Sequence, residues 1–247
     1  LGGARNKCPV YATFGFGFYQ AEELAEAAAR WQAKGFSRLK MTVGNQALSR
    51  RDEPRLLNDV IMDDAKRVEI VRKAVGRGAE LFIDANCSLD LYHARQLCQM
   101  IEPFDIEFFE EPVTQNDIRQ MAELRSQTTI RLACGQNEGQ AYRFRDMMIA
   151  GAVDIIQPNV AITGGFTQCQ KIAALANSFN ISVDNGGAWP FFNQHLQAGL
   201  SNGGLVEYHY SSVEVCKHIY TGLPEPEQGW LTMTDAPGLG FDLNQAA

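Results

Sequence analysis

The feature that most constrains this chain is a repeated spacing of oxygen-bearing side chains. Asp84, Glu110 and Gln136 each follow a short apolar run, and each lies 26 residues after the one before it. A strand, a helix and two short loops together need a stretch of this length. One such side chain therefore recurs at the same place in three successive strand–helix units. In a closed barrel, the carboxyl ends of neighbouring strands meet at one mouth, where three oxygen ligands suit a hard divalent cation.

The length and composition of the chain allow such a barrel. The chain has 247 residues, 45% of them hydrophobic, and a net charge of −7. A (β/α)8 barrel typically has about 250 residues. No run of lysine or arginine predicts a nucleic-acid surface, and no apolar run approaches the ~18 residues of a membrane span. The six cysteines form no C-x-x-C pair, so we interpret them as free buried thiols in a reducing cytoplasm.

Eight predicted strands alternate with helical stretches. We place the strands at residues 10–14, 38–43, 80–85, 106–110, 130–134, 154–157, 181–184 and 205–209. We place helices at 21–34, 60–75, 115–125, 142–149 and 191–200, with two more opening at Ser88 or Asp90 and at Gly164-Gly165, and a polar insertion at 44–59. This alternation predicts a parallel sheet, and eight units favour a closed barrel over an open doubly wound sheet. We interpret residues 221–247 as a meandering tail packed on the barrel and not as a new domain. Residues 1–247 are therefore predicted to form a single domain.

Alternation along the strands predicts which side chains face the barrel interior. Lys40 shares a face with Thr42 in one strand, and Asp84 shares a face with Asn86 in the next. The faces at the mouth also carry Glu110, Gln136, Asn159, Gly186 and Glu207. Taken alone, such a group is better explained without function: residues 84–86 as a helix-entry cap, and residues 110–112 as a solvated strand exit. A scaffold would not need such groups at nearly every strand end, so the set predicts a functional site.

These residues resemble the enolase superfamily, in its mandelate racemase and muconate lactonizing branch. The matching segments are 35–44, 83–86, 109–112, 134–137, 154–159, 163–165 and 237–240, in the family's order and over nearly the whole chain. The resemblance implies a modified (β/α)7β form of the α/β TIM-type barrel that binds Mg²⁺ and removes a proton next to a carboxylate. A metal on the carboxylate oxygens stabilises the negative charge that builds up there. The family also has an α+β capping domain before the barrel, which we expect to be absent from this chain.

The resemblance assigns the metal ligands with one departure from the family. Asp84 and Glu110 are the first two ligands that it implies. The third ligand is usually Glu or Asp, and here the position holds Gln136, whose amide oxygen can coordinate but brings no charge. Glu138, two residues further on, is the alternative third ligand. Asn86 would lie beside the ion and contact the substrate.

The proton acceptor is the larger departure. The family often has Lys-x-Lys at the end of the second strand, but here Lys40 is followed by Met and Thr42. The second lysine, usually the base, is therefore missing, and Thr42 becomes a candidate substrate contact. The family's other base, a His on strand seven with an Asp on strand six, is replaced by Gly186 and Asn159. Lys40 is the best remaining base, since a lysine in a dry pocket loses its proton more readily. Its alternative role is a permanent cation that holds the substrate carboxylate.

The remaining strand ends supply further candidates. Glu207 can donate a hydrogen bond or a proton to the substrate, and His209, on the same face, is a candidate acid or base. Asp184 and Asn185 are candidate contacts for polyol hydroxyls, and Asn159 is a further candidate substrate contact. His195 is interpreted as structural, and Arg143 and Arg145 as solvated surface residues.

Three functions compete. The first is a Mg²⁺-dependent lyase that dehydrates a sugar acid, because a mouth rich in Asn, Gln, Asp and Glu suits a polyhydroxylated substrate. The second is a racemase or epimerase of the same family, which normally needs two bases. The third is a catalytically degenerate barrel with a binding role, which the four replacements at positions 42, 136, 159 and 186 favour. The predicted partner is a small-molecule carboxylate, with no nucleic acid and no membrane, and the resemblance implies a homo-oligomer.

Overall fold

The computed structural model describes residues 1–44 and 56–246, and these residues form two compact units. The Lys40 unit comprises residues 14–134 and 146–154. The Glu207 unit comprises residues 1–13, residues 135–145 and the chain from Ile155 onward. Most of the polar insertion predicted at 44–59 lies outside the described residues. The interpretation of residues 1–247 as one domain stays a prediction.

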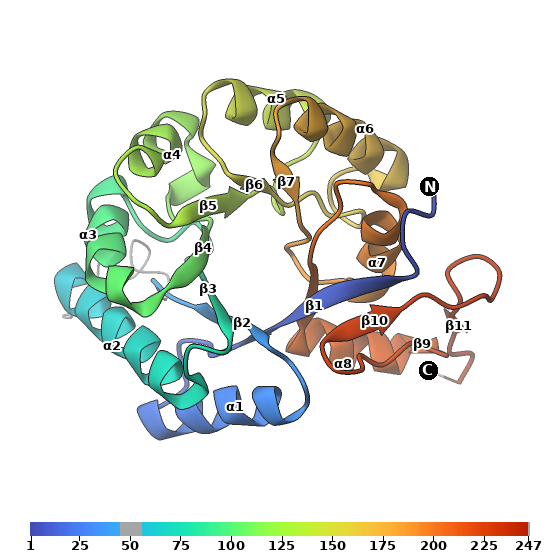
Figure 1. Ribbon diagram of the computed structural model, residues 1–247, viewed down its shortest axis with the longest axis horizontal. Coiled ribbons are helices and arrows are strands. Elements are labelled where there is room, and N and C mark those ends of the chain that lie inside the picture. The colour runs from blue at the N-terminus through green and yellow to red at the C-terminus, as the bar shows by residue number, and fades with distance from the viewer. Residues whose placement is uncertain (45–55, 247) are drawn as a thin grey trace. The chain divides into compact units, whose positions relative to one another are not determined.

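Parallel strands form the centre of the Lys40 unit (Figure 1). β2 (Arg38–Thr42), β3 (Glu80–Asp84), β4 (Ile106–Glu110) and β5 (Arg131–Cys134) pair side by side in that order. The helices α1 (Ala21–Ala33), α2 (Leu57–Val75), α3 (Leu91–Ile101) and α4 (Ile118–Arg125) lie on their outer side, with short 3-10 helices at Glu102–Phe104 (η1) and Thr114–Asn116 (η2). The carboxyl ends of the strands therefore come together, as the 26-residue spacing predicts.

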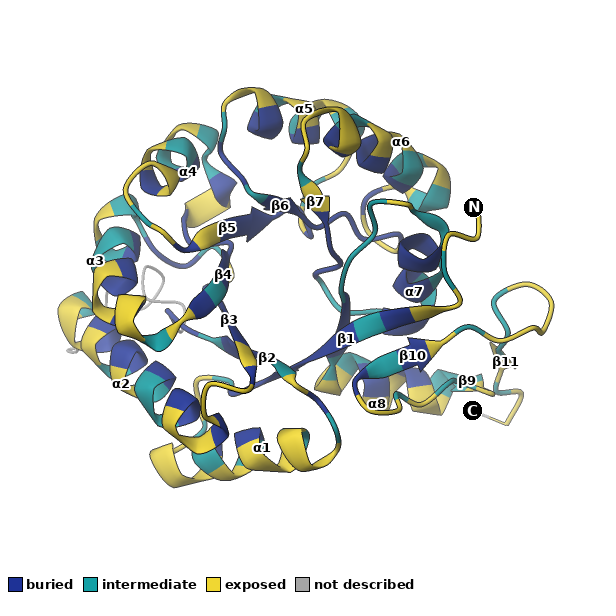
Figure 2. Cartoon of the chain, viewed as in Figure 1, coloured by how far each residue is buried: buried dark blue, intermediate teal, exposed yellow. Residues whose placement is uncertain are grey.

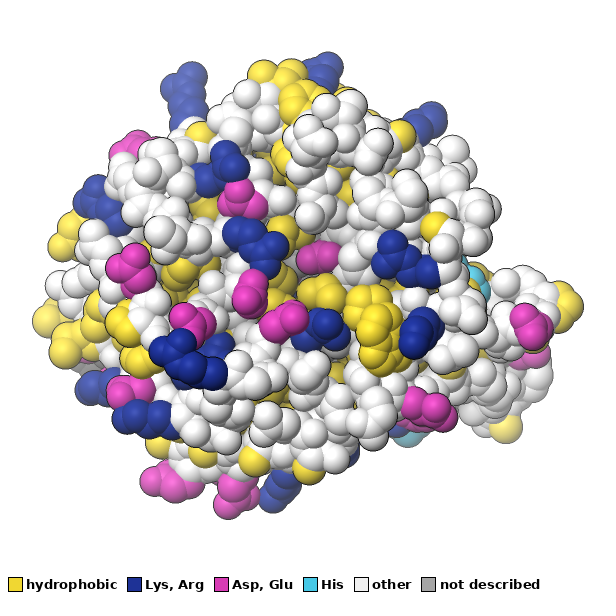
Figure 3. All heavy atoms as spheres, in the orientation of Figure 1, with side chains coloured by type: hydrophobic (Ala, Val, Ile, Leu, Met, Phe, Trp, Pro, Cys, Tyr) yellow, Lys and Arg dark blue, Asp and Glu magenta, His cyan; other side chains and the backbone are white. Residues whose placement is uncertain are grey.

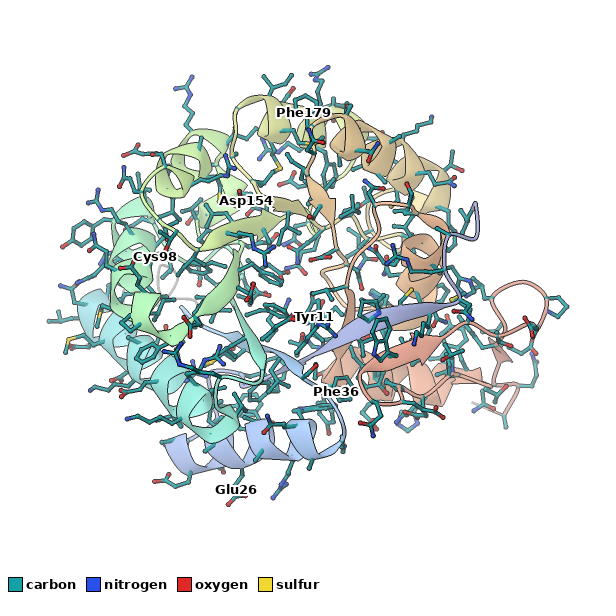
Figure 4. The ribbon with its side chains drawn as sticks, in the orientation of Figure 1. Tyr11, Glu26, Phe36, Cys98, Asp154 and Phe179 are labelled. Atoms are coloured by element: carbon teal, nitrogen blue, oxygen red, sulfur yellow. The ribbon has the colours of Figure 1, made fainter. Side chains whose placement is uncertain are left out.

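The helices of this unit are amphipathic, which explains why they cover the strands. α1 buries Leu24 and Ala28, four residues apart, while Glu26 points away from the strands (Figure 4). Figure 2 shows the same division on α2 and α3, whose buried residues lie toward the sheet and whose exposed residues lie outside. Apolar side chains spaced three or four residues apart share one helix face, so burying that face against the sheet removes it from water.

Helix starts follow local capping chemistry. Asp90, one of the two caps considered for α3, accepts a hydrogen bond from the His93 backbone N–H at 2.9 Å. The helix predicted from residue 115 begins instead at Ile118, because Asp117 caps it by accepting two backbone N–H groups at 3.0 Å. Gln115 has a left-handed backbone, with φ of 57°, that interrupts the helix before this point.

The Glu207 unit contains the remaining strands. β1 (Lys7–Phe14) pairs in parallel with β8 (Val206–His209), and β6 (Ile155–Ile156) pairs in parallel with β7 (Ser182–Val183). α6 (Gly165–Ser178) follows β6, and α7 (Pro190–Gly199) follows β7. α5 (Ala141–Ile149) begins in this unit and ends in the other. Each predicted strand is present, although β6 and β7 are shorter than expected.

The segment after β8 differs from the expected simple tail. α8 (Tyr210–Ile219), which the sequence analysis did not include, follows β8 directly and buries Val213 and Cys216. β9 (Tyr220–Thr221) pairs with β11 (Asp242–Leu243), and β10 (Trp230–Thr232) pairs antiparallel with the start of β1. The Lys7 ammonium lies 4.7 Å from the centre of the Trp230 ring, which adds a cation–π contact to this pairing.

Two further expectations concern the cysteines and the surface. All six cysteines are free thiols, five of them buried, which confirms the absence of a disulfide framework. Among the described residues, no helix combines the length and apolar character needed to cross a bilayer. Acidic and basic side chains are interspersed on the face shown in Figure 3. Ion pairs such as Arg38–Glu80 and Arg131–Glu107, at 3.0 and 2.7 Å, join the starts of neighbouring strands in the Lys40 unit.

Candidate active site

The ends of β2, β3 and β4 bring three predicted site residues together. The parallel register places Lys40 beside Phe82 and Asp84 beside Glu110. Because side chains alternate between the two faces of a strand, Phe82 and Asp84 share a face, as do Phe108 and Glu110 on the next strand. The rings of Phe82 and Phe108 stack with centres 4.3 Å apart and planes 3° apart. An apolar layer therefore lies next to the pair of carboxylates.

Lys40 joins the two carboxylates. Its ammonium nitrogen lies 2.6 Å from Glu110 Oε2 and 3.2 Å from Asp84 Oδ2. The side chains of Lys40 and Glu110 are fully buried, and that of Asp84 is 6% exposed. Removing three charges from water is unfavourable, and their mutual attraction compensates for it only while all three stay together. The trio carries a formal charge of −1, which leaves it attractive to a further cation.

The two carboxylates fit a hard divalent cation. Both reach the same cationic atom, so their oxygens converge on one point, and carboxylate oxygens are the ligands that Mg²⁺ prefers. Asp84 Oδ1 also accepts the Asn86 backbone N–H at 2.8 Å, which fixes the orientation of this carboxylate. Within residues 1–44 and 56–246, no group of three or more His, Cys, Asp and Glu side chains is arranged so that it could hold a metal ion. Gln136 and Glu138 remain the predicted candidates for a third protein ligand.

Thr42 and Asn86 flank this group on the same strand ends. Thr42 is the register partner of Asp84, and its hydroxyl donates to the Gly15 carbonyl at 3.2 Å. Asn86 is exposed and has a left-handed backbone, with φ of 47°. Both residues line a cavity of about 570 Å³, so their position suits the predicted contact with a ligand.

Gln136 and Glu138 come just after β5 in the chain, and both belong to the Glu207 unit. Gln136 is buried and packs on Gly187. A side chain at position 187 would bring its Cβ atom within 3.0 Å of Gln136 Cβ, and Gly187 also has φ of +73°. Glu138 pairs with Arg143 at 2.9 Å. Arg143, which we expected to be a solvated surface residue, is only partly exposed and holds this carboxylate. It stays a prediction that either residue binds the same cation as Asp84 and Glu110.

Asn159 holds a strained loop. Its amide nitrogen donates to the carbonyls of Gly186, Gly187 and Ala188 at 2.7, 2.9 and 3.1 Å. Its amide oxygen accepts the Ala161 backbone N–H at 2.9 Å, and the residue is fully buried. The loop needs this support because Ala188 has φ of 67°, in a region that favours glycine. Direct contact of Asn159 with substrate would require these bonds to break.

The neighbours of this loop are held in the same way. Asn185 is fully buried, accepts the Glu207 backbone N–H at 3.0 Å and donates to the Gly186 carbonyl at 2.8 Å. Asp184 accepts the Leu205 backbone N–H at 2.8 Å. Both residues therefore organise the path from β7 to β8, and their predicted role in binding polyol hydroxyls stays a prediction.

Glu207 and His209 lie on β8 next to β1. The Glu207 carboxylate accepts the Thr13 hydroxyl at 2.5 Å and the Ala188 backbone N–H at 2.6 Å, and it is almost fully buried. Since both oxygens already face donors, a proton-donating role would require one of these bonds to be given up. His209 pairs with Thr13 in the parallel register and is partly buried at the start of α8.

Sequence reasoning missed Asn193, which holds the loop after β7. Asn193 donates to the Ala188 and Trp189 carbonyls at 3.3 and 3.0 Å and to Asn159 Oδ1 at 3.1 Å. Its signal was a set of buried amides in one helix, since α7 also buries Gln194 and Gln197. By contrast, His195 meets its predicted structural role, since it bonds the Leu239 carbonyl at 3.0 Å and burial lowers its pKa.

Comparison with known proteins places these sites in a family context. The family model described as enolase C-terminal domain-like matches residues 23–247. The chain is 26% identical to an arabinonate dehydratase of Saccharolobus solfataricus over 98% of its own length. It is 28% identical to a 3,6-anhydro-alpha-L-galactonate cycloisomerase of Streptomyces coelicolor over 99% of its length. It spans 63% of the length of each of these two relatives.

The solved structures confirm the fold class. A mandelate racemase/muconate lactonizing enzyme from a marine actinobacterium, in complex with magnesium, matches 99% of this chain and 65% of its own. The sequence identity is 30% and the TM-score is 0.86. The chain therefore has the α/β barrel fold that its strand–helix alternation and its motifs predict.

Proposed function

Because the chain belongs to the enolase C-terminal domain-like family, we propose that it is the barrel of a Mg²⁺-dependent lyase that dehydrates a sugar acid. The observation that carries this proposal is the convergence of Asp84 and Glu110 on one buried ammonium group. The names of the relatives, an arabinonate dehydratase and an anhydro-galactonate cycloisomerase, support a sugar-acid substrate. The reaction removes the proton next to the carboxylate and then releases the β-hydroxyl as water.

Asp84 and Glu110 would hold the metal ion, with Gln136 or Glu138 as the third protein ligand. When bound, the ion stabilises the negative charge that develops on the substrate carboxylate as the α-proton leaves. Two carboxylates supply most of the charge that a divalent cation needs, so an amide in the third position weakens the site without abolishing it. Lys40 reduces the repulsion between the carboxylates before the ion binds.

Lys40 is the proposed proton acceptor. It is a basic side chain in contact with both proposed ligands, and it lies beside Phe82 in the strand register. Its ammonium is paired with both carboxylates, so this role requires the metal ion to take its place on them first. In the alternative role it stays charged and holds the substrate carboxylate. Glu207, fixed by Thr13 and by the backbone of Ala188, is proposed to orient the substrate or to take part in release of the hydroxyl.

The test is an NMR assay in deuterated water with Mg²⁺ and a panel of sugar acids. Loss of the α-proton signal together with a 2-keto-3-deoxy product supports the lyase. Exchange of the α-proton without elimination supports the racemase or epimerase instead. Absence of both contradicts the proposal and leaves the binding role.

A matched pair of variants links the activity to the site. Glu110→Gln removes one proposed ligand charge and is expected to abolish turnover. Glu107→Gln, at the other end of the same strand, removes an exposed carboxylate that pairs with Arg131 and is expected to retain activity. Equal activity of the two variants would count against Glu110 as a ligand.

A further inference from the structure

A cavity of about 570 Å³ lies beyond the carboxyl ends of β2 and β3, next to the proposed metal ligands. Its lining consists of Phe16, Gly17, Phe18, Thr42, Val43, Ala85 and Asn86. Ala85 and Asn86 directly follow Asp84 in the chain, and the Asn86 backbone N–H bonds the Asp84 carboxylate. The cavity is within the size range of small-ligand pockets, and it adjoins the proposed ligand Asp84 through Ala85 and Asn86.

One wall of the cavity is an exposed aromatic stack. The rings of Phe16 and Phe18 lie 5.8 Å apart with planes 25° apart, and those of Phe18 and Tyr19 lie 5.0 Å apart with planes 24° apart. Phe18 is 73% exposed. Neighbouring aromatic rings that remain open to water form an apolar surface that a ligand can cover.

The aromatic wall is held in place by α2. The Arg67 guanidinium donates to the carbonyls of Gly15, Phe16 and Thr42 at 2.7, 3.1 and 2.9 Å. Asp64 accepts from Arg67 at 2.9 Å and from the Gly44 backbone N–H at 2.6 Å. These bonds tie the segment after β1 to the end of β2. A wall fixed before binding loses little conformational freedom when a ligand arrives.

Another part of the lining is polar. Asn86 offers an exposed amide, which can both donate and accept hydrogen bonds. The left-handed backbone of Asn86, with φ of 47°, is fixed by the bond from its N–H to Asp84. The cavity thus combines an apolar aromatic surface with a hydrogen-bonding amide. A sugar ring has the matching surfaces, because one face presents C–H groups while its hydroxyls point outward.

We propose that this cavity binds the sugar ring of a cyclic sugar acid, with the C–H face of the ring on Phe18 and a hydroxyl on Asn86. The inference rests on the proposed function and narrows its substrate class from sugar acids in general to ring-containing ones. An open-chain acid of the same size has no flat apolar face and gains less from the aromatic stack.

The experiment compares two probes of equal carbon number on the full chain with Mg²⁺. D-glucuronate carries its carboxylate on a pyranose ring, whereas D-gluconate is an open chain. Dissociation constants come from NMR titration, and saturation transfer shows which probe protons contact the protein. Phe18→Ala removes the exposed ring, and Phe179→Ala, at an exposed phenylalanine after α6 (Figure 4), is the matched control.

The wild-type chain is expected to bind glucuronate more tightly than gluconate. Phe18→Ala is expected to weaken glucuronate binding by about tenfold, which corresponds to one aromatic contact, and to leave gluconate binding within about twofold. Phe179→Ala is expected to change neither. Equal effects of Phe18→Ala on both probes, no effect on either, or no binding of glucuronate would overturn the proposal.

A third variant separates this inference from the proposed function. Glu110→Gln is expected to weaken both probes, because both carry the carboxylate that the metal site would bind. If Glu110→Gln leaves both affinities unchanged while Phe18→Ala still weakens glucuronate selectively, the ring subsite stands and the proposed reaction at Glu110 fails. If Glu110→Gln weakens the binding of both probes and Phe18→Ala does not selectively weaken glucuronate binding, only the ring subsite fails and the proposed reaction stands.

Discussion

Removal of the Lys40 charge is the sharpest test of the buried site. In Lys40→Met, the carboxylates of Asp84 and Glu110 face each other without their shared ammonium, at 6% and 0% exposure. Breaking a buried ion pair by removing one partner typically lowers the free energy of unfolding by about 3–5 kcal/mol. We expect a loss of this size in the presence of a chelator.

Magnesium should reverse part of this loss. A ligand that binds only the folded chain at about 100 times its dissociation constant raises the free energy of unfolding by about 2.7 kcal/mol. Mg²⁺ is expected to bind Lys40→Met more tightly than the wild-type chain, because the competing ammonium is gone. The double variant Lys40→Met/Glu110→Gln should lose less stability than Lys40→Met, since only one buried carboxylate remains.

The assay is urea unfolding monitored by circular dichroism, with EDTA or with Mg²⁺. The variants are compared provided that the slope of the unfolding free energy against urea concentration is the same for each. Lys73→Met is the control, since Lys73 pairs with Glu69 at 2.6 Å on the exposed side of α2. Exposed pairs contribute about 0–1 kcal/mol. The reasoning is refuted if Lys40→Met destabilises the chain no more than Lys73→Met, or if Mg²⁺ stabilises the wild type and Lys40→Met equally.

Three further predictions concern the loop, a histidine and a thiol. Asn193→Ala should lower the free energy of unfolding by about 1–3 kcal/mol through lost buried hydrogen bonds and speed amide hydrogen exchange in residues 186–189; unchanged exchange there would contradict its role in holding the loop. Burial lowers the pKa of His195 in the folded chain, so the unfolded chain binds the proton more readily and stability should fall as the pH drops below about 6.5. His195→Gln should flatten that fall, and an unaltered pH profile would argue against this assignment. Burial raises the pKa of the Cys98 thiol to about 12, so a disulfide reagent at mildly alkaline pH should label it only after unfolding, as peptide mass spectrometry can check.

The strands and their order follow from local sequence. Apolar runs with period-two alternation, separated by amphipathic helices, predict each parallel strand, and the structure places all of them within a few residues of the expected positions. Asp84 and Glu110 close two such runs, so their common register position was predictable from the spacing alone. α8 was missed because Tyr210–Ile219 follows β8 without a turn signal and buries only a narrow stripe that includes Val213 and Cys216.

Only the tertiary structure shows what these residues contact. Alternation says that Lys40 and Asp84 share an interior, but the position of the ammonium between two carboxylates depends on strand register and on the Phe82–Phe108 layer. Likewise, Asn159 has the residue type of a substrate contact, yet its amide bonds a strained loop 27 or more positions away in the chain. Side-chain partners that are distant in sequence are set by packing, which no local pattern encodes, whereas strand and helix periods are properties of neighbouring residues.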